Sequence, residues 1–337
     1  AKIVYAKNLF LIPLAYALGR NVVLSSVSWN RVLGLLLGIG ALAAIVSVLE
    51  YVSGVHLHQV LGFGELKSVV DDIEPQGEFG LSWTFERQGG LPRFAAFFAD
   101  PLEYSASLLL FLAVTIRLVF SSKTPKLKAE YTAIMALFIL AFFMAYSRSA
   151  IVAATGMALF GFYITKQYRV IFSVVGAVLA VGLYVYFLSS EETRYFIEDT
   201  LTFQNSSSLG HLLEWAQGVA SMIDNPQGIG LAMSGNAGGV DETIKVGGEN
   251  QFLIIGVQMG VLGMLLYIVL LVKAILSGVS LFKKGTTTQH KDVGFISALV
   301  KVGLLLPLFT ANAELYLFVA LFSWFLVGQT QAMLNRK

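Results

Sequence analysis

Eight apolar stretches follow one another along this chain, and each is close to the length that crosses a lipid bilayer. A helix needs roughly 20 apolar residues to span the hydrocarbon core. Because unpaired backbone groups are too costly there, each such stretch is expected to be a helix. The stretches are residues 32–52, 101–120, 131–146, 150–165, 170–188, 251–276, 293–310 and 315–333. The sequence therefore predicts an all-α, polytopic transmembrane bundle of about eight spans.

Composition agrees with this class and excludes several kinds of chemistry. Only 13% of the residues are charged, whereas soluble domains have about 25%. The chain has no cysteine, which excludes disulfides and thiolate nucleophiles. It also lacks the GxxxxGK[ST] phosphate loop, so an ATP-driven or cytoplasmic enzyme is not expected. No nucleic acid is predicted as a partner, and the lipid bilayer is.

Basic residues set the predicted orientation of the bundle. Lys and Arg concentrate in the short turns, and such turns face the cytoplasm in membrane proteins. The two long polar loops, residues 53–100 and 189–248, contain few basic residues and are predicted to lie on the outer side. The Ser147–Ser149 turn falls on the outer side in the same alternation. The chain is thus expected to form one transmembrane domain with two long extracytoplasmic loops.

The second outer loop is the expected location of the functional site. It contains an amphipathic helical pattern at residues 209–223, where His211 and Trp215 lie four positions apart and so share a face. A glycine-rich turn follows, and Glu249 and Asn250 stand directly before the next span. Taken alone, His211 is best interpreted as a surface histidine, and Glu249 could be a simple helix cap.

Two arginines on the predicted outer side are candidate anion ligands. Arg148 occupies the tip of a tight hairpin, against the tendency of basic residues to face inward. Arg93 precedes the point where the first outer loop re-enters the membrane. A guanidinium group matches the geometry of phosphate oxygens. The alternatives are that Arg148 extends to the membrane interface and that Arg93 contacts lipid headgroups.

Four stretches resemble the O-antigen ligase and O-antigen polymerase (Wzy-type) superfamily. Arg93 to Ala106 is similar to the family pattern Arg-x-x-Gly-x-x-x-x-Pro-Asn, with Ala96 in place of Gly and Leu102 in place of Asn. The turn Tyr146–Ser149 is similar to the family's Ser-Arg-Gly/Ser turn.

The other two stretches lie in and after the second outer loop. Leu209 to Gly230 resembles an Arg-x-x-x-Trp helix followed by Pro-x-Gly-x-Gly, with His211 where Arg is common. Glu249-Asn250, nine residues and then Gly260-Val261-Leu262-Gly263 resemble the ligase motif His-[Asn/Ser/Gln]-x9-Gly-x-x-Gly, with Glu in place of His.

The resemblance implies a GT-C-like membrane glycosyltransferase. Its donor would be an undecaprenyl-diphosphate-linked oligosaccharide, and its acceptor a glycan hydroxyl on the outer side of the bacterial cytoplasmic membrane. No cofactor and no metal are implied, and a flippase and a chain-length regulator are implied as partners. Arg148 and Arg93 would bind the diphosphate, and Asn250 and Trp215 other parts of the substrate. Family members have more spans, so N-terminal spans are expected to be missing from this sequence.

Because Glu replaces the family His, the identity of the catalytic base is left open. Glu249 or His211 could serve, or the acceptor hydroxyl needs little activation. The replacement favours an O-antigen or exopolysaccharide polymerase over a ligase that transfers to lipid A-core. A membrane transporter and a non-catalytic scaffold are the alternatives of other classes. A transporter would have a site near the bilayer midplane, and in a scaffold Arg148 and Glu249 would not share a cavity.

Overall fold

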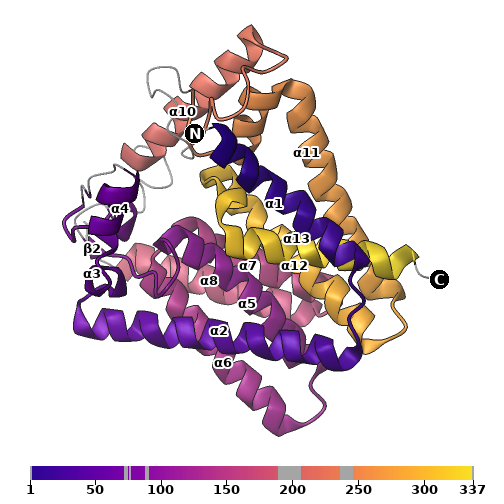
Figure 1. Cartoon of the computed structure of the whole chain (residues 1–337). Coiled ribbons are helices and arrows are strands. Elements are labelled where there is room, and N and C mark those ends of the chain that lie inside the picture. Colours follow the sequence, from indigo (N-terminus) through magenta and orange to yellow (C-terminus); the bar gives the residue numbers. More distant parts are fainter. Residues whose placement is uncertain are drawn as a thin grey trace. The chain divides into compact units, whose positions relative to one another are not determined.

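A computed structural model of the chain describes residues 2–71, 75, 77–87, 91–188, 206–235 and 246–335. Within these residues the fold is almost entirely helical, and the predicted all-α polytopic class is confirmed (Figure 1). Six helices are long and apolar enough to cross a membrane: α2 (Ser26–Ser53), α5 (Pro101–Ser121), α6 (Pro125–Ala145), α11 (Gln251–Lys284), α12 (Thr288–Thr310) and α13 (Leu317–Asn335). Two further apolar helices, α7 (Arg148–Ile164) and α8 (Tyr168–Leu188), occupy the other two predicted spans.

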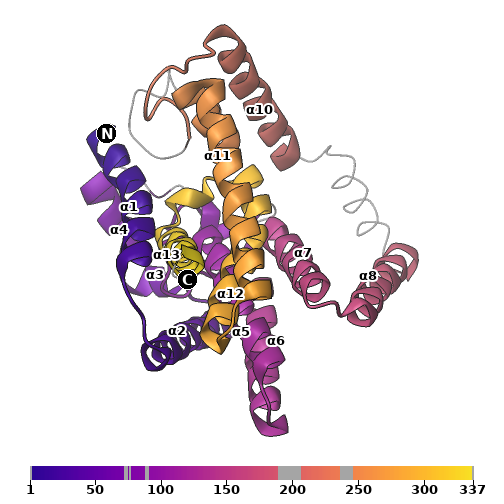
Figure 2. The same ribbon diagram turned by 90° about the vertical axis from the view of Figure 1, so that its right-hand side faces the viewer.

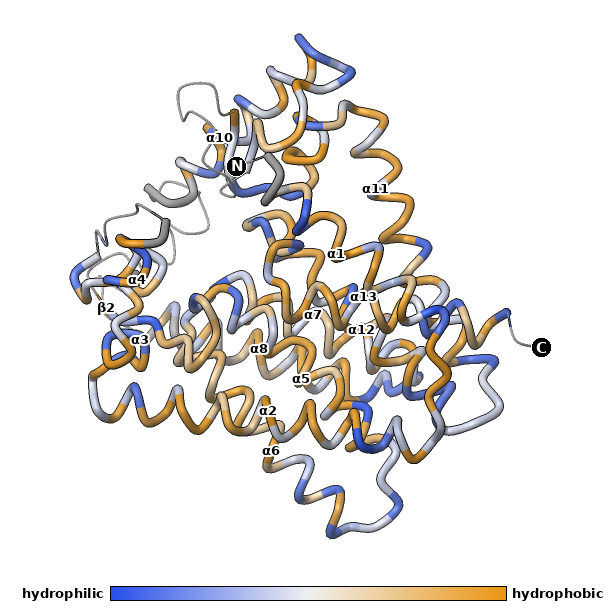
Figure 3. Tube along the Cα trace, in the orientation of Figure 1, coloured by the Kyte–Doolittle hydropathy of each residue, from blue (hydrophilic) through white to orange (hydrophobic). Residues whose placement is uncertain are grey.

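The remaining elements are short or lie in the loops. They are α1 (Lys2–Asn21), α3 (Leu57–Val60), α4 (Phe63–Asp71), the 3-10 turn η1 (Trp83–Phe85), β1 (Glu86–Arg87), β2 (Leu91–Pro92), α10 (Ser206–Asp224) and the 3-10 turn η2 (Ala313–Leu315). The two strands form one antiparallel pair. Apolar residues cover most of α2, α5 and α11, and hydrophilic residues gather at the turns (Figure 3).

Local sequence explains where the spans begin. Asp100 caps α5, since its Oδ1 accepts hydrogen bonds from the backbone N–H groups of Leu102 and Glu103 at 2.7 and 2.8 Å. Pro101 then occupies the first turn, where its missing N–H costs nothing. Thr124 caps α6 in the same way, again with a proline behind it. The turn between α6 and α7 is tight, as predicted, because Tyr146 adopts a left-handed conformation at the end of α6.

The described chain divides into two compact units that interleave along the sequence. Unit 1 consists of Ala1–Leu11, Ala158–Lys273 and Leu308–Leu315. Unit 2 consists of Ile12–Met157, Ala274–Pro307 and Tyr316–Lys337. Helix α11 therefore begins in unit 1 and ends in unit 2.

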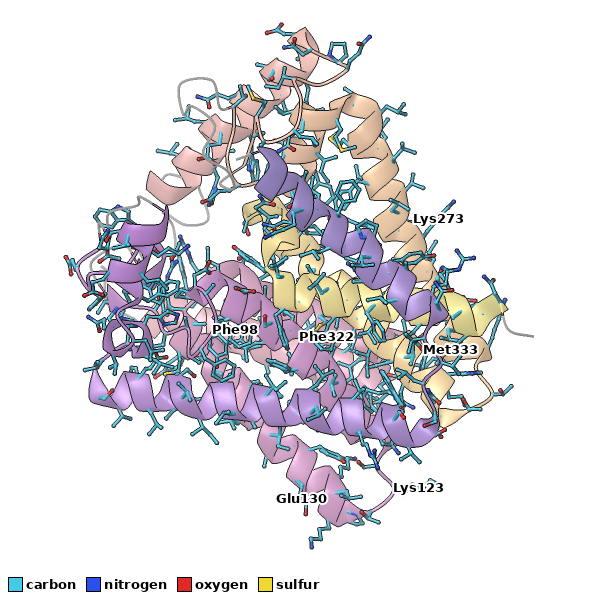
Figure 4. The ribbon with its side chains drawn as sticks, viewed as in Figure 1. Phe98, Lys123, Glu130, Lys273, Phe322 and Met333 are labelled. Atoms are coloured by element: carbon cyan, nitrogen blue, oxygen red, sulfur yellow. The ribbon has the colours of Figure 1, made fainter. Side chains whose placement is uncertain are left out.

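Helix α5 is the buried centre of unit 2 and packs with α2 and α6. Around its upstream end the rings of Phe98, Phe111 and Phe318 have centroids 5.4 to 6.5 Å apart. Figure 4 shows Phe98 among packed side chains, whereas Lys123 and Glu130 lie at the opposite end of the α5–α6 hairpin. The basic turn and the first long loop therefore lie at opposite ends of this hairpin, as the predicted alternation requires.

Charged side chains within the spans of unit 2 have partners. Arg117 of α5 donates from Nε to Asp292 of α12 at 2.7 Å, and both side chains are buried. Lys301 is 1% exposed, and its Nζ lies 3.8 Å from the centroid of the Trp324 ring. Such pairing is expected where a charge is removed from water.

The first long loop folds around a small aromatic core in unit 2. The core contains Leu81, Phe85 and Ala95, with Phe63 and Phe79 packed against it. His56 is fully buried, with its ring 4.8 Å from Phe79 and 4.9 Å from Phe94. Burial, together with the charge of the neighbouring His58, lowers the pKa of His56 to about 4. The imidazole is therefore neutral at physiological pH.

One buried carboxylate ties this loop to α2. Glu50 Oε1 accepts a hydrogen bond from the Leu57 N–H at 2.8 Å, and its Oε2 accepts one from the Ala96 N–H at 2.9 Å. The same side chain thus fixes both the beginning and the end of the loop.

Unit 1 is built on the contact between α10 and the upstream part of α11 (Figure 2). Two glycines allow a close approach. A Cβ added at Gly218 would lie 3.4 Å from Leu253, and one added at Gly256 would lie 2.5 Å from Met222 Sδ. The predicted helix 209–223 is present as α10, and its apolar side chain Met222 packs against α11.

Candidate functional site

The glycine-rich turn after α10 inserts into a break in α11. Gly260 has a φ of 77° and a ψ of 174°, so α11 is interrupted at this residue. The backbone groups released by the break bond to the turn instead. Ile229 N–H donates to Val257 O at 2.8 Å, Gly230 N–H donates to Gln258 O at 3.1 Å, and Val261 N–H donates to Pro226 O at 3.0 Å. The Pro-x-Gly-x-Gly and Gly-x-x-Gly patterns therefore form a single interlocked structure.

Glycine is required on both sides of this interlock. Gly228 has a φ of 86°, and an added Cβ would lie 2.6 Å from Gln258 O and from Gly260 N. An added Cβ at Gly260 would overlap the Pro226 carbonyl oxygen. A kink in a long helix usually needs a proline or an inserted group, and here the inserted group is the turn itself.

Asn250 stands directly before α11 and bonds to its first turn. Asn250 is buried, and its Oδ1 accepts hydrogen bonds from the N–H groups of Phe252 at 3.0 Å and Leu253 at 3.3 Å. It therefore caps α11. The predicted contact between Asn250 and substrate stays a prediction.

Glu249 and His211 meet in unit 1. His211 Nδ1 lies 3.3 Å from Glu249 Oε2, and the two side chains are 27% and 34% exposed. His211 and Trp215 share a face of α10, with their ring centroids 6.5 Å apart. Glu249, which stands where the resembled motif has histidine, thus contacts His211. Such a pair can accept and hold a proton.

A second carboxylate, Glu214, joins this pair and was not predicted. One ligand atom from each of His211, Glu214 and Glu249 lies within 4.8 Å of the others. Glu214 also packs against Gly248, where an added Cβ would lie 2.6 Å from its Oε2. Its spacing from His211 is three residues, which places both on one helix face. That spacing is the signal that could have identified it.

The three groups have the chemistry of a cation site as well as that of an acid–base relay. One imidazole and two carboxylates are ordinary zinc ligands, with bonds of about 2.0–2.2 Å. Ligand atoms at tetrahedral angles around such an ion are about 3.3–3.6 Å apart, so the spread of up to 4.8 Å would require the three side chains to move together by roughly 1 Å. The expectation of a metal-free site stays a prediction.

Arg148 and Arg93 both belong to unit 2. Arg148 is exposed and is the first residue of α7, behind the buried Ser147. Arg93 follows β2, and its N–H donates to Phe85 O at 2.7 Å. The pKa of Asp100 is raised above its usual value, because the effect of burial exceeds the opposing effects of the capping N–H groups of α5 and of the charge of Arg93. Since His211 and Glu249 belong to unit 1, the expectation that Arg148, His211 and Glu249 line one cavity stays a prediction.

Comparison with known proteins finds a family likeness in the second half of the candidate site. Residues 133–268 match the family model described as O-antigen ligase. A search of curated proteins finds no match. The matched stretch contains Arg148, His211, Glu249 and the Gly260 break, and it leaves Arg93 outside. Over residues 133–268 the chain is therefore similar to the O-antigen ligase family, which is consistent with the O-antigen ligase and polymerase superfamily.

Proposed function

We propose that this chain is a polysaccharide polymerase of the bacterial cytoplasmic membrane. It transfers a glycan from undecaprenyl diphosphate to an acceptor sugar hydroxyl, in the synthesis of O-antigen or exopolysaccharide. The family match supports an enzyme of the O-antigen ligase or polymerase type in general. The observation that carries the finer proposal is the contact between Glu249 and His211 at the start of α11.

In the proposed reaction the acceptor hydroxyl oxygen attacks the anomeric carbon of the donor glycan. The bond from that carbon to the diphosphate oxygen breaks, and the diphosphate leaves with the electron pair. Glu249 takes the hydroxyl proton, and His211 Nδ1 holds and orients the carboxylate at 3.3 Å. A general base of this kind contributes about 10²–10⁴-fold to the rate.

Arg148 and Arg93 are proposed to stabilise the charge that develops on the leaving diphosphate. This role requires both guanidinium groups on the outer side, where residues 53–100 and 189–248 form the extracytoplasmic loops of one transmembrane domain. Trp215 and Asn250 are proposed to contact other parts of the substrate. A flippase that supplies the lipid-linked repeat and a chain-length regulator are the proposed membrane partners, and no cofactor or metal takes part.

The break in α11 is a feature shared with transporters, whose discontinuous helices bind substrate with unwound backbone groups. Here the groups released at the break are occupied by the Pro226–Gly230 turn. This favours an enzyme with its site beside the helix start over a transporter with its site in the break.

The function is tested with purified protein, lipid-linked repeat units and two acceptors. The polymerase is expected to form a ladder on repeat units alone. Transfer to lipid A-core without a ladder would identify the ligase instead, and no transfer to either acceptor would refute both. Glu249→Gln is expected to lose about 10²–10⁴-fold in turnover while it still binds the donor. Near-normal turnover of this variant would exclude Glu249 as the base and leave His211 as the candidate.

A further inference from the structure

Asn312 is a buried side chain whose hydrogen-bonding capacity is unused. It is 7% exposed, and neither its Nδ2 nor its Oδ1 has a partner among the residues that the structure describes. A carboxamide offers two donors and an acceptor oxygen. A buried amide without partners costs more than a made hydrogen bond gains, so it calls for a ligand.

A second unsatisfied amide lies nearby in unit 1. Gln251 is 2% exposed, and its Oε1 has no partner in the described part of the chain. Gln251 and Ile254 are three residues apart on α11 and share a face. A Cβ added at Gly235 would lie 3.1 Å from Asn312 Nδ2 and 3.2 Å from Ile254. The two amides therefore flank the same stretch of loop and helix.

Two polar side chains of the same region do have partners. Gln258 Nε2 donates to Ser234 O at 2.7 Å, and the hydroxyl of Tyr267 donates to Glu314 Oε1 at 2.6 Å. The amides of Asn312 and Gln251 therefore lie in a polar part of unit 1 whose neighbouring groups bond to one another.

These amides lie close to the proposed base. Gln251 follows Glu249 by two positions, so their Cα atoms are at most about 7 Å apart. The Ser234 hydroxyl lies 3.8 Å from the position of a Cβ at Gly247, two residues before Glu249. The 231–235 segment therefore borders both the residues before Glu249 and the Asn312 side chain. A single sugar ring can reach from Glu249 to an amide at this separation.

The side chains around Asn312 and Gln251 favour a neutral ligand. The charged side chains named above are the acids Glu249 and Glu314, which disfavour phosphate or another anion. Sugar hydroxyls donate and accept at once, and they match the paired donor and acceptor of a carboxamide. We infer that Asn312 and Gln251 form a subsite for the hydroxyl groups of the acceptor sugar, beside the carboxylate that takes its proton. This inference rests on the proposed function and assigns the sugar side of the same site.

The test separates a ligand subsite from a structural role. The probe is the free oligosaccharide repeat, released from its lipid diphosphate by mild acid, so that binding needs no donor. Asn312→Leu and Gln251→Met replace each amide by an apolar group of similar size. Each variant is expected to bind the oligosaccharide about tenfold more weakly and to unfold at or above the wild-type temperature, because it removes an unsatisfied group. Gln258→Leu is the matched control and is expected to lower the unfolding temperature, since its amide holds the Ser234 carbonyl.

Two results would overturn the inference. One is wild-type oligosaccharide binding by both variants. The other is a drop in the unfolding temperature of both variants, as expected if a buried water satisfies the amides and the side chains have a structural role. The polymer ladder measures the proposed function separately. Wild-type protein that binds the oligosaccharide through Asn312 but transfers nothing would refute the proposed function and leave the subsite standing.

Discussion

Replacement of Gly260 by alanine tests the interlock between the glycine-rich turn and α11. Gly260 has a φ of 77° and a ψ of 174°, a conformation that is essentially restricted to glycine and costs another residue about 1–3 kcal/mol. The added Cβ would also overlap the backbone of Pro226 and Gln227. Because both obstacles are backbone, the turn has to move out of the break.

Movement of the turn breaks three backbone hydrogen bonds, from Ile229, Gly230 and Val261. Each is worth about 0.5–1.5 kcal/mol. Together with the conformational cost, Gly260→Ala should lower the free energy of unfolding by about 3–7 kcal/mol. A loss of this size lowers the unfolding temperature by at least about 5 °C in a chain of this length. Polymer formation should fall as well, since the turn leads into the segment that borders Glu249.

The assay is thermal unfolding of purified protein in detergent, followed by tryptophan fluorescence. Gly210→Ala is the matched control, because Gly210 lies in α10 with no atom within 4 Å of an added Cβ. Alanine is favoured over glycine in a helix by about 1 kcal/mol, so this control should not destabilise. Unfolding of Gly260→Ala at the wild-type temperature would refute the interlock.

Three further predictions concern charge. Arg148→Lys keeps the charge but loses the planar fork, so polymer should drop sharply at normal protein level; full activity of this variant beside an inactive Arg93→Lys would reverse the assignment of the main diphosphate ligand. Since the folded-state pKa of His56 is lowered from 6.5 to about 4, the unfolded state binds more protons, and stability should fall by about 3 kcal/mol as pH drops from about 6.5 to 4. His56→Phe should flatten that pH dependence of the unfolding temperature, and an unchanged slope would contradict it. Chelation with EDTA should leave the polymer ladder intact, and loss of activity restored by a divalent cation would assign His211, Glu214 and Glu249 to a metal.

The sequence predicted the spans well because their apolar length is a direct consequence of the bilayer. Each predicted span is a helix, and α10 lies where the apolar spacing placed it. Features that depend on local contacts could also be predicted from the sequence, as the tight turn before Arg148 shows.

The break at Gly260 was not predicted, because a glycine inside an apolar run is equally a packing residue. Only its contact with a turn some 30 positions earlier gives it a φ above zero. The unsatisfied amides of Asn312 and Gln251 could not be recognised either. Whether a buried polar group has a partner depends on elements far apart in the sequence, and spacing within one helix does not reveal it.

The break in α11 also separates a part of the helix that can span the membrane from a part that lies beside the proposed site. The part from Val261 to Lys284 extends roughly 36 Å at about 1.5 Å per residue, which is enough to cross a hydrocarbon core of about 30 Å without help. The part from Gln251 to Met259 is therefore not needed to span the membrane. Under the proposed function, substitutions in this part would change which glycan is accepted without weakening the insertion of the helix into the membrane. Specificity could then diverge while the topology stays fixed.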